Sequence, residues 1–203
     1  MFENTTIKEF TELLASPSSV PGGGGASALA GAIGIALGDM VGEHTLGKKK
    51  YADVEEDIKA LMARAQDIRA RLVECVEKDA VAFEPLSKAY SIPKDEPRRE
   101  EILEKCLRDA AEVPMEIFDL CCEAIEICEE FGGKGSRLIL SDAATGAAVL
   151  RAALLGAAIN VRVNTKLMKD REYASSMDLR IDERLKKYTD MADKTFDRIF
   201  NNL

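Results

Sequence analysis

The chain has few of the residues that build metal and nucleophile sites. It contains one histidine, His44, and five cysteines, with no C-x-x-C pair and no histidine close to a cysteine. A zinc site with the usual cysteine and histidine spacing is therefore not predicted. The cysteines fall within helical patterns and are expected to be buried structural thiols: Cys75, Cys106, Cys121, Cys122 and Cys128. A lone histidine near a helix end is more often incidental than an acid or base, so His44 is not predicted to act.

An excess of positive charge is also missing. The 203 residues include 28 basic and 36 acidic side chains, for a formal net charge of −8. Affinity for nucleic acid depends on cationic surface, so nucleic-acid binding is not expected. An anionic ligand would need a local basic patch.

One run could at first suggest a membrane span. The longest weakly polar run, residues 20–41, is dominated by glycine and alanine and is interrupted by Asp39, so no membrane role is expected. Residues 1–4 lack a positive region followed by an apolar run, the pattern of a secretory signal. We expect a cytoplasmic protein.

Strand signals are nearly absent, whereas apolar residues recur at spacings of three and four, the period of amphipathic helices. Helices are expected over about 7–16, 25–46, 53–91, 97–131, 141–168 and 172–200. Ser141 or Asp142 is expected to cap the fifth, and Pro114 to kink the fourth. Without repeats or composition shifts, residues 1–203 are expected to form a single-domain, all-α bundle of about six helices.

The second expected helix is rich in glycine and alanine. Small residues recur there every four positions: Ala26, Ala30, Gly34, Gly38 and Gly42. Such a strip lets neighbouring helices approach closely, which offsets the roughly 1 kcal/mol of helix propensity lost per glycine. We expect this helix to be central.

Two unusual segments flank that helix. Before it stand Pro21, Gly22, Gly23, Gly24 and Gly25, and after it stand Lys48, Lys49 and Lys50. A backbone without side chains allows a ligand to approach closely, and a cationic cluster about a helix length away could hold that ligand's negative end. The alternatives are a flexible entry turn and a solvated basic helix end. The segment matches neither the phosphate-loop nor the dinucleotide-binding glycine pattern.

Asp79 interrupts an apolar helical stripe, with Cys75 and Phe83 one turn to either side. A desolvated carboxyl there would have a raised pKa and could exchange a proton near neutral pH. Pro85 frees the carbonyl of Val81 nearby. A buried aspartate paired with a lysine is an equally open alternative.

Asn160 and Asn164 form a second polar interruption, on a stripe that continues through Val163 and Leu167. Their spacing of four puts both amides on one face of the helix. They could hydrogen-bond a heterocycle or satisfy each other across helices.

Four segments carry a resemblance to a known family. They are PGGGGASALAGAIGIALGDMVG with HTLGKKKY, DAVAF followed by an Ile-Pro-Lys turn, GSRLILSDAATGAA, and GAAINVRVN. Together they cover nearly the whole chain, and in this order and spacing the sequence resembles the cyclodeaminase/cyclohydrolase family of folate enzymes.

The resemblance implies an all-α homodimer that binds tetrahydrofolate derivatives in a groove between helices, with no metal and no cofactor beyond the folate. It implies that Asp79 is catalytic. It assigns pocket-lining roles to Pro21, Gly22, Gly23, Gly24, Gly25, Lys48, Lys49, Lys50, Ser141, Asp142, Asn160 and Asn164. Ser136 stands where the family commonly has asparagine, and neither Asp39 nor His44 matches a fixed family residue.

The absence of a transferase domain and the GKKKY corner favour a 5,10-methenyltetrahydrofolate cyclohydrolase. A 5-formimidoyltetrahydrofolate cyclodeaminase is the close alternative. A dimeric scaffold that has lost catalysis, and uses its Gly/Ala strip only for packing, is the remoter one.

Overall fold

A computed structural model describes residues 2–202 of the chain, and helix dominates them, with no strand among these residues. The α-helices are α1 Ile7–Leu14, α2 Gly23–Glu43, α3 Glu55–Ala89, α4 Arg99–Lys134, α5 Leu140–Thr165 and α6 Arg171–Phe200. Short 3-10 helices are η1 Phe2–Asn4, η2 Lys49–Val54 and η3 Arg137–Ile139. The prediction of an all-α bundle of about six helices is confirmed.

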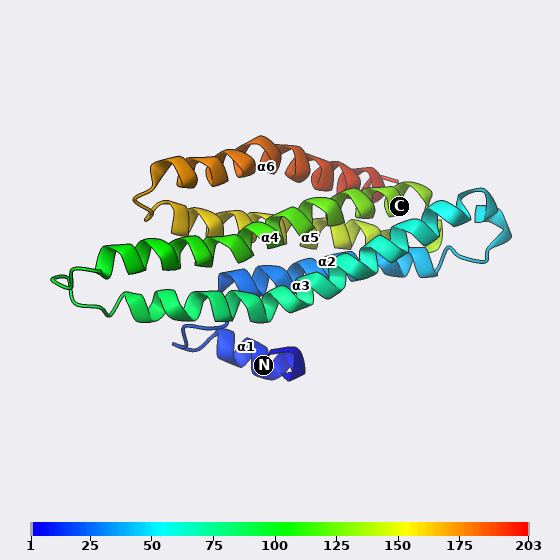
Figure 1. Cartoon of the computed structure of the whole chain (residues 1–203). Helices are drawn as coiled ribbons and strands as arrows, with labels where there is room; N and C mark the ends of the chain where they lie inside the picture. The colour runs from blue at the N-terminus through cyan, green and yellow to red at the C-terminus, as the bar shows by residue number, and fades with distance from the viewer. Residues whose placement is uncertain (1, 203) are drawn as a thin grey trace.

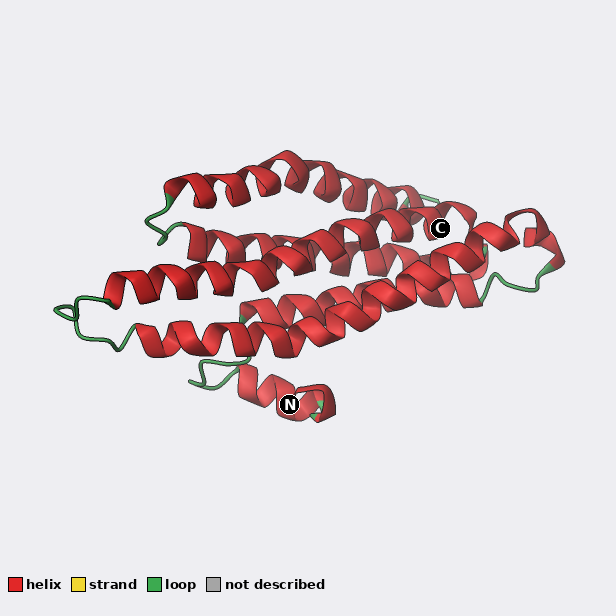
Figure 2. Ribbon diagram, in the orientation of Figure 1, coloured by secondary structure: helices red, strands yellow, loops and turns green. Residues whose placement is uncertain are grey.

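The long helices lie lengthwise in two layers (Figure 1). Helices α3 and α4 form the front layer and α2 and α5 the layer behind it, while α6 runs along one edge and α1 along the other. Helix α2 packs against α3, α4 and α5, as expected of a central helix. The loops that join α2 to α6 in order lie at the two ends of the bundle, whereas the loop between α1 and α2 lies along its side (Figure 2).

Close packing between α2 and α5 explains part of the glycine pattern. A Cβ on Gly34 would lie 2.6 Å from Leu150 Cγ and 3.1 Å from the Gly146 carbonyl oxygen. The two helices run antiparallel, because Gly23 lies beside Asn160 while Gly34 lies beside Gly146. Close approach along the strip is thus confirmed at the glycines.

The alanines of that strip behave differently. Ala26 and Ala30 are only half-buried, so the prediction of one continuous packed strip is wrong at its N-terminal end. At this end of α2 the close contact with Leu72 and Cys121 is made by Gly31, one position past Ala30. The packed face of the helix therefore lies to one side of the two alanines.

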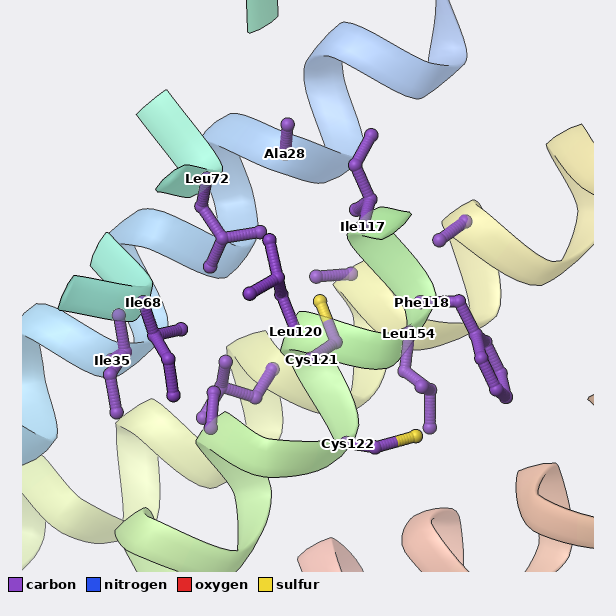
Figure 3. Close-up of a cluster of buried hydrophobic side chains, with 14 of the residues drawn as sticks. Ala28, Ile35, Ile68, Leu72, Ile117, Phe118, Leu120, Cys121, Cys122 and Leu154 are labelled. Atoms are coloured by element: carbon purple, nitrogen blue, oxygen red, sulfur yellow. The ribbon is translucent and has the colours of Figure 1, made fainter. Parts of the chain in front are cut away.

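A single hydrophobic cluster runs through the bundle. In Figure 3, Leu72 of α3 and Leu120 of α4 meet near the middle of the cluster, and Ile35 of α2 lies beside Ile68 of α3. The predicted burial of cysteine is confirmed for four residues, Cys75, Cys121, Cys122 and Cys128, whereas Cys106 is half-buried. Desolvation raises the pKa of the Cys75 thiol to about 12, so this thiol is inert near neutral pH.

Helix boundaries depart from the expectation at several ends. Neither Ser141 nor Asp142 caps α5; both lie in its first turn, because η3 leads directly into a helix that starts at Leu140. Helix α2 starts at Gly23, two residues early, with Gly22 as its N-cap. Asp170 caps α6 by accepting a hydrogen bond from Tyr173 N–H at 3.0 Å.

Helix α2 and the stretch 137–165 are long and apolar enough, by length and composition, to cross a membrane. Of their most apolar windows, 61% and 39% respectively are buried inside the bundle. Core helices of soluble proteins pass the same test. The low value for the second stretch shows that one side of α5 remains uncovered by this chain.

Candidate active site

A groove of about 180 Å³ opens where the start of α2 meets α3, α4 and the last turns of α5. Its lining residues are Ser19, Val20, Gly22, Gly23, Gly24, Asp79, Phe83, Ala110, Pro114, Asn160, Val163 and Asn164. One carboxyl, two amides and a bare helix N-terminus converge on an otherwise apolar wall. This combination is typical of a small-molecule site.

Asp79 is the acidic group of the groove. Its Oδ2 accepts a hydrogen bond from Gly25 N–H at 2.9 Å, and among residues 2–202 no lysine or arginine pairs with it. The alternative of an aspartate paired with lysine is therefore wrong. Burial raises the pKa of this carboxyl above its usual range, and the Gly25 hydrogen bond offsets only part of that rise. A carboxyl of this kind can exchange a proton near neutral pH.

The glycine turn is pressed against the polar groups. A Cβ on Gly24 would lie 2.1 Å from Asp79 Oδ1, and a Cβ on Gly23 would lie 2.9 Å from Asn160 Nδ2. A side chain at position 24 would force Asp79 to move, and one at position 23 would require a smaller shift of Asn160. The segment is thus the tightly packed first turn of α2 and not a flexible entry loop.

The helix start adds hydrogen-bond donors. Residues in the first turn of a helix have no intrahelical acceptor for their N–H groups. The Gly25 N–H donates a hydrogen bond to Asp79, whereas the N–H groups of Gly23 and Gly24 donate to no acceptor in the described part of the chain. These N–H groups and the positive end of the helix dipole favour negative charge in the groove.

The two asparagines have different environments. Asn164 is buried, and its Nδ2 donates to the main-chain carbonyls of Ala110 at 3.2 Å and Asn160 at 3.0 Å. Pro114 has no N–H, so it cannot satisfy the Ala110 carbonyl one turn earlier, and Asn164 replaces that bond. The side chains do not satisfy each other, which was one of the alternatives.

Asn160 is more available. Its Nδ2 donates to the Gly156 carbonyl at 2.7 Å, while its Oδ1 accepts no hydrogen bond from the described residues. Asn160 therefore offers the groove a free acceptor.

The apolar lining was largely missed by sequence reasoning. Val163 and Leu167 were expected on an interior stripe, yet they are 56% and 52% exposed. The buried side of α5 instead carries small and branched residues such as Leu150, Leu154 and Val161. For Phe83, the available signal was its spacing of one turn from Asp79.

The lysines lie at the other end of the bundle. Lys48 Nζ lies 3.2 Å from Ser136 Oγ, and Tyr51 OH accepts a hydrogen bond from Arg137 N–H at 3.1 Å. We call Lys48, Lys49, Lys50 and Arg137 the basic corner. Within residues 2–202, no acidic side chain forms an ion pair with any of its three lysines. Ser141 and Asp142 lie at the same end, in the first turn of α5.

The predicted site residues thus form two groups. Helix α2 separates the glycine turn from the lysines, and its 21 residues span about 30 Å. Asn160 and Ser141 are separated by a similar length of α5. The structure brings together Gly22, Gly23, Gly24, Asp79, Asn160 and Asn164, with Pro21 and Gly25 in the same turn, but it does not bring the lysines, Ser141 or Asp142 to them within one chain.

The sequence model of the formiminotransferase-cyclodeaminase family matches residues 6–183. The chain belongs to the formiminotransferase-cyclodeaminase family. The match includes both groups of candidate residues.

Three proteins are similar to this chain over most of its length. A methenyltetrahydrofolate cyclohydrolase of Methylorubrum extorquens is 38% identical over 92% of this chain and 88% of its own length. A formimidoyltransferase-cyclodeaminase of Sus scrofa is 29% identical over 95% of this chain, which spans only 36% of that protein. The crystal structure of a Thermotoga maritima formiminotetrahydrofolate cyclodeaminase superposes with a TM-score of 0.85 at 27% identity, covering 98% of this chain and 96% of the other.

Three other residues that the sequence analysis singled out lie outside the groove. Ser136 is buried and its N–H donates to Thr45 Oγ1 at 2.8 Å, so it joins the basic corner to α2. Asp39 is buried 3.8 Å from Arg69, and burial raises its pKa. His44 is exposed at the end of α2. Neither Asp39 nor His44 lines the groove.

Proposed function

We propose that this member of the family is a 5,10-methenyltetrahydrofolate cyclohydrolase, which hydrolyses the bridging carbon to give 10-formyltetrahydrofolate. The observation that carries the proposal is Asp79, a desolvated carboxyl with no cationic partner, held by the first turn of α2. The Methylorubrum relative of nearly equal length supports the choice of substrate.

The substrate's charge suits this groove. In 5,10-methenyltetrahydrofolate a cationic amidine carbon joins two nitrogens. The ionised Asp79 lacks a lysine or arginine counter-ion in the described chain, so the substrate cation would supply the missing positive charge. In a water-poor groove this attraction is stronger than in bulk solvent.

Hydrolysis requires two proton transfers, and Asp79 can perform both. It accepts a proton from water as the water oxygen bonds to the amidine carbon, giving a tetrahedral carbon that bears one oxygen and two nitrogens. It then returns that proton to one nitrogen as that carbon–nitrogen bond breaks, and the remaining hydroxyl proton is released to solvent as the C=O bond forms, leaving the formyl group on the other nitrogen. General acid–base catalysis of this kind contributes about 10²–10⁴-fold.

The neighbouring groups would orient the folate. The free N–H groups of Gly23 and Gly24 suit the developing oxygen charge. We place the free Oδ1 of Asn160 on the pterin edge, while Asn164 positions Asn160 through its main chain. We assign the glutamate tail to Lys48, Lys49 and Lys50. The proposed chemistry uses no metal and no cofactor beyond the folate.

Cyclodeaminase activity is the second candidate, favoured by the Thermotoga neighbour and the mammalian relative. In that reaction the folate amine closes onto a formimidoyl carbon and ammonia leaves. Both reactions pass through a tetrahedral carbon bearing several heteroatoms, so the same carboxyl could serve either. A homodimer and a cytoplasmic location complete the proposal; mass measurement and cell fractionation test them.

Paired assays test the proposed activity. Purified protein is mixed with 5,10-methenyltetrahydrofolate in a buffer that does not catalyse its hydrolysis, and the methenyl absorbance is followed. In parallel, 5-formimidoyltetrahydrofolate is supplied and ammonia is measured. We expect rapid loss of the methenyl absorbance and no ammonia. Appearance of the chromophore with ammonia would establish the cyclodeaminase instead, and no reaction in either assay would favour the scaffold.

A further inference from the structure

A second cavity lies at the end of the bundle away from the Asp79 groove. It encloses about 650 Å³, against about 180 Å³ for the groove. Its walls come from η2, the last turn of α4, the turn that leads into α5 and the last turns of α6, which meet at one end of the bundle (Figure 1). We call this cavity the α4/α6 pocket. Its volume lies in the range of about 300–1,000 Å³ that is usual for a small organic ligand.

Positive charge lines the α4/α6 pocket. Lys50, Lys134, Arg137 and Arg198 all border it, and no described acidic side chain does. Lys134 is neutralised by ion pairs with two carboxylates, at 2.9 and 2.8 Å. Within residues 2–202, the other three cations form no ion pair with an acidic side chain. In a protein with a net charge of −8, this group creates a local positive potential that favours an anion.

The end of α4 accounts for only part of this charge. The last carbonyl groups of a helix attract cations, and Arg198 Nη2 donates to the Glu129 carbonyl at 3.4 Å. Two glycines of α4 allow this guanidinium to approach the helix closely. A Cβ on Gly132 would lie 3.3 Å from Arg198 Nη2, and a Cβ on Gly133 would lie 3.6 Å from Nη1. The carbonyl of Glu129 occupies one donor of Arg198, and a guanidinium has five.

Donors therefore remain on three sides of the pocket. Arg198 of α6 donates no other hydrogen bond to the described residues. The side chain of Arg137, in the turn before α5, donates none, because only its main-chain N–H is bonded, to Tyr51 OH. Lys50 Nζ of η2 lies 5.6 Å from the centre of the Tyr51 ring and donates to no acceptor in the described part of the chain. An anion in the pocket would meet charged donors from all three segments.

This arrangement suits phosphate groups. Planar guanidinium groups bind phosphate oxygens through paired hydrogen bonds, and lysine adds a compact point charge. Three cations around one cavity match a compact, multiply charged anion such as a di- or triphosphate, whereas the carboxylates of a peptide-like chain are spread along it. Tyr51, Leu140 and Ile199 also line the pocket, and they provide an apolar surface for the organic part of a phosphate ester.

The proposed folate reaction does not explain the pocket. That reaction assigns Lys50 to the glutamate tail but uses neither Arg137 nor Arg198. The family match ends at residue 183, so the wall contributed by the end of α6 lies beyond it. Arg137 follows Ser136, the position where the family commonly has asparagine. Two of the three unpaired cations thus have no role in the activity proposed above.

We propose that the α4/α6 pocket binds an oligophosphate anion, either free or carried by a nucleotide, through Lys50, Arg137 and Arg198. Because Lys50 is also assigned to the glutamate tail, the bound anion competes with that tail and raises KM for the folate without changing kcat. This competition rests on the proposed function, whereas the binding itself does not.

Calorimetric titration tests the binding. The wild type is titrated with inorganic triphosphate, and we expect saturable binding. Arg137→Gln and Arg198→Gln should each weaken the affinity at least about tenfold, because each removes a charged hydrogen-bond donor. Lys194→Gln is the matched control, since Lys194 is an exposed cation one turn earlier on α6 that does not line the pocket. The control should bind as the wild type does. Absence of saturable binding, or an equal loss of affinity in Lys194→Gln, would overturn the proposal.

Two further anions identify the chemistry of the ligand. Adenosine triphosphate, supplied without magnesium, is compared with inorganic triphosphate. Tighter binding of the nucleotide identifies a nucleotide site, and tighter binding of the inorganic anion identifies a site for free oligophosphate. A peptide of three glutamates linked through their side-chain carboxyl groups presents carboxylates instead. If this peptide binds as tightly as triphosphate, the pocket recognises carboxylates and its assignment to phosphate is overturned.

Kinetics test the competition. Initial rates of methenyl absorbance loss are measured over a range of folate concentrations, with and without inorganic triphosphate. Triphosphate should raise KM of the wild type severalfold and leave kcat unchanged. Arg198→Gln should have wild-type kcat and should not respond to triphosphate. An unchanged KM in a wild type that binds triphosphate would overturn the competition. A wild type that turns over neither folate defeats the proposed function, and the calorimetry then decides on the phosphate site alone.

Discussion

Replacing Asp79 with asparagine separates proton transfer from structure. Asparagine has nearly the same shape, and its Oδ1 can still accept the Gly25 N–H hydrogen bond that holds Asp79 at 2.9 Å. The amide neither gains nor loses a proton near neutral pH. We expect kcat to fall by about 10²–10⁴-fold, which corresponds to roughly 3–5 kcal/mol of transition-state stabilisation.

Loss of methenyl absorbance measures this effect under substrate saturation, with circular dichroism to verify the fold. Asp67→Asn is the matched control, because Asp67 is an exposed aspartate on the same helix and, within residues 2–202, forms an ion pair with Arg71 alone, at 3.8 Å. The control should keep wild-type turnover. If Asp79→Asn also keeps turnover within about threefold, the carboxyl does not transfer the proton and the mechanism is wrong.

Three further results follow from the same geometry. Gly24→Ala places a Cβ 2.1 Å from Asp79 Oδ1, so turnover should drop at least about tenfold and the free energy of unfolding should fall by about 1–3 kcal/mol. Unchanged kinetics would show that the Asp79 side chain can move without loss of function. Because the folded-state pKa of Asp79 is raised, the protonated carboxyl stabilises the fold, and this stability is lost as pH rises through the folded-state pKa. Asp79→Asn should therefore raise Tm relative to wild type more at pH 7 than at pH 4. An equal change in Tm at both pH values would refute the raised pKa. Asn164→Ala leaves the Ala110 carbonyl without its donor and should lower the free energy of unfolding in urea by about 1–3 kcal/mol. Adding Pro114→Ala, which restores a main-chain N–H, should recover part of that loss. If the effects of the two substitutions simply add, Asn164 does not replace the missing hydrogen bond.

Local patterns predicted the helices and the polar groups of the groove. The apolar period specified the long helices, and Asp79 and Asn160 stood out because each interrupts a helical stripe. Their common location follows from the antiparallel packing of α2 on α5, with Gly23 and Gly24 allowing the contact. Single-sequence periodicity contains no direct information about that packing.

The errors have physical reasons too. Val163 has the spacing of an interior residue but is exposed, because periodicity identifies an apolar face and not what covers it. The prediction that Ser141 or Asp142 caps α5 was wrong because η3 continues directly into that helix. The lysines do lie a helix length from the glycine turn, as predicted. Within one chain, however, α2 is straight and holds the two groups apart.

The most direct measurement is a crystal structure of the Asp79→Asn variant with 5,10-methenyltetrahydrofolate bound. We expect the bridging carbon beside residue 79, with room for a water about 3–3.5 Å from the carbon. A folate bound away from the groove at the start of α2 would contradict the assignment of Asp79 as the group that moves the proton.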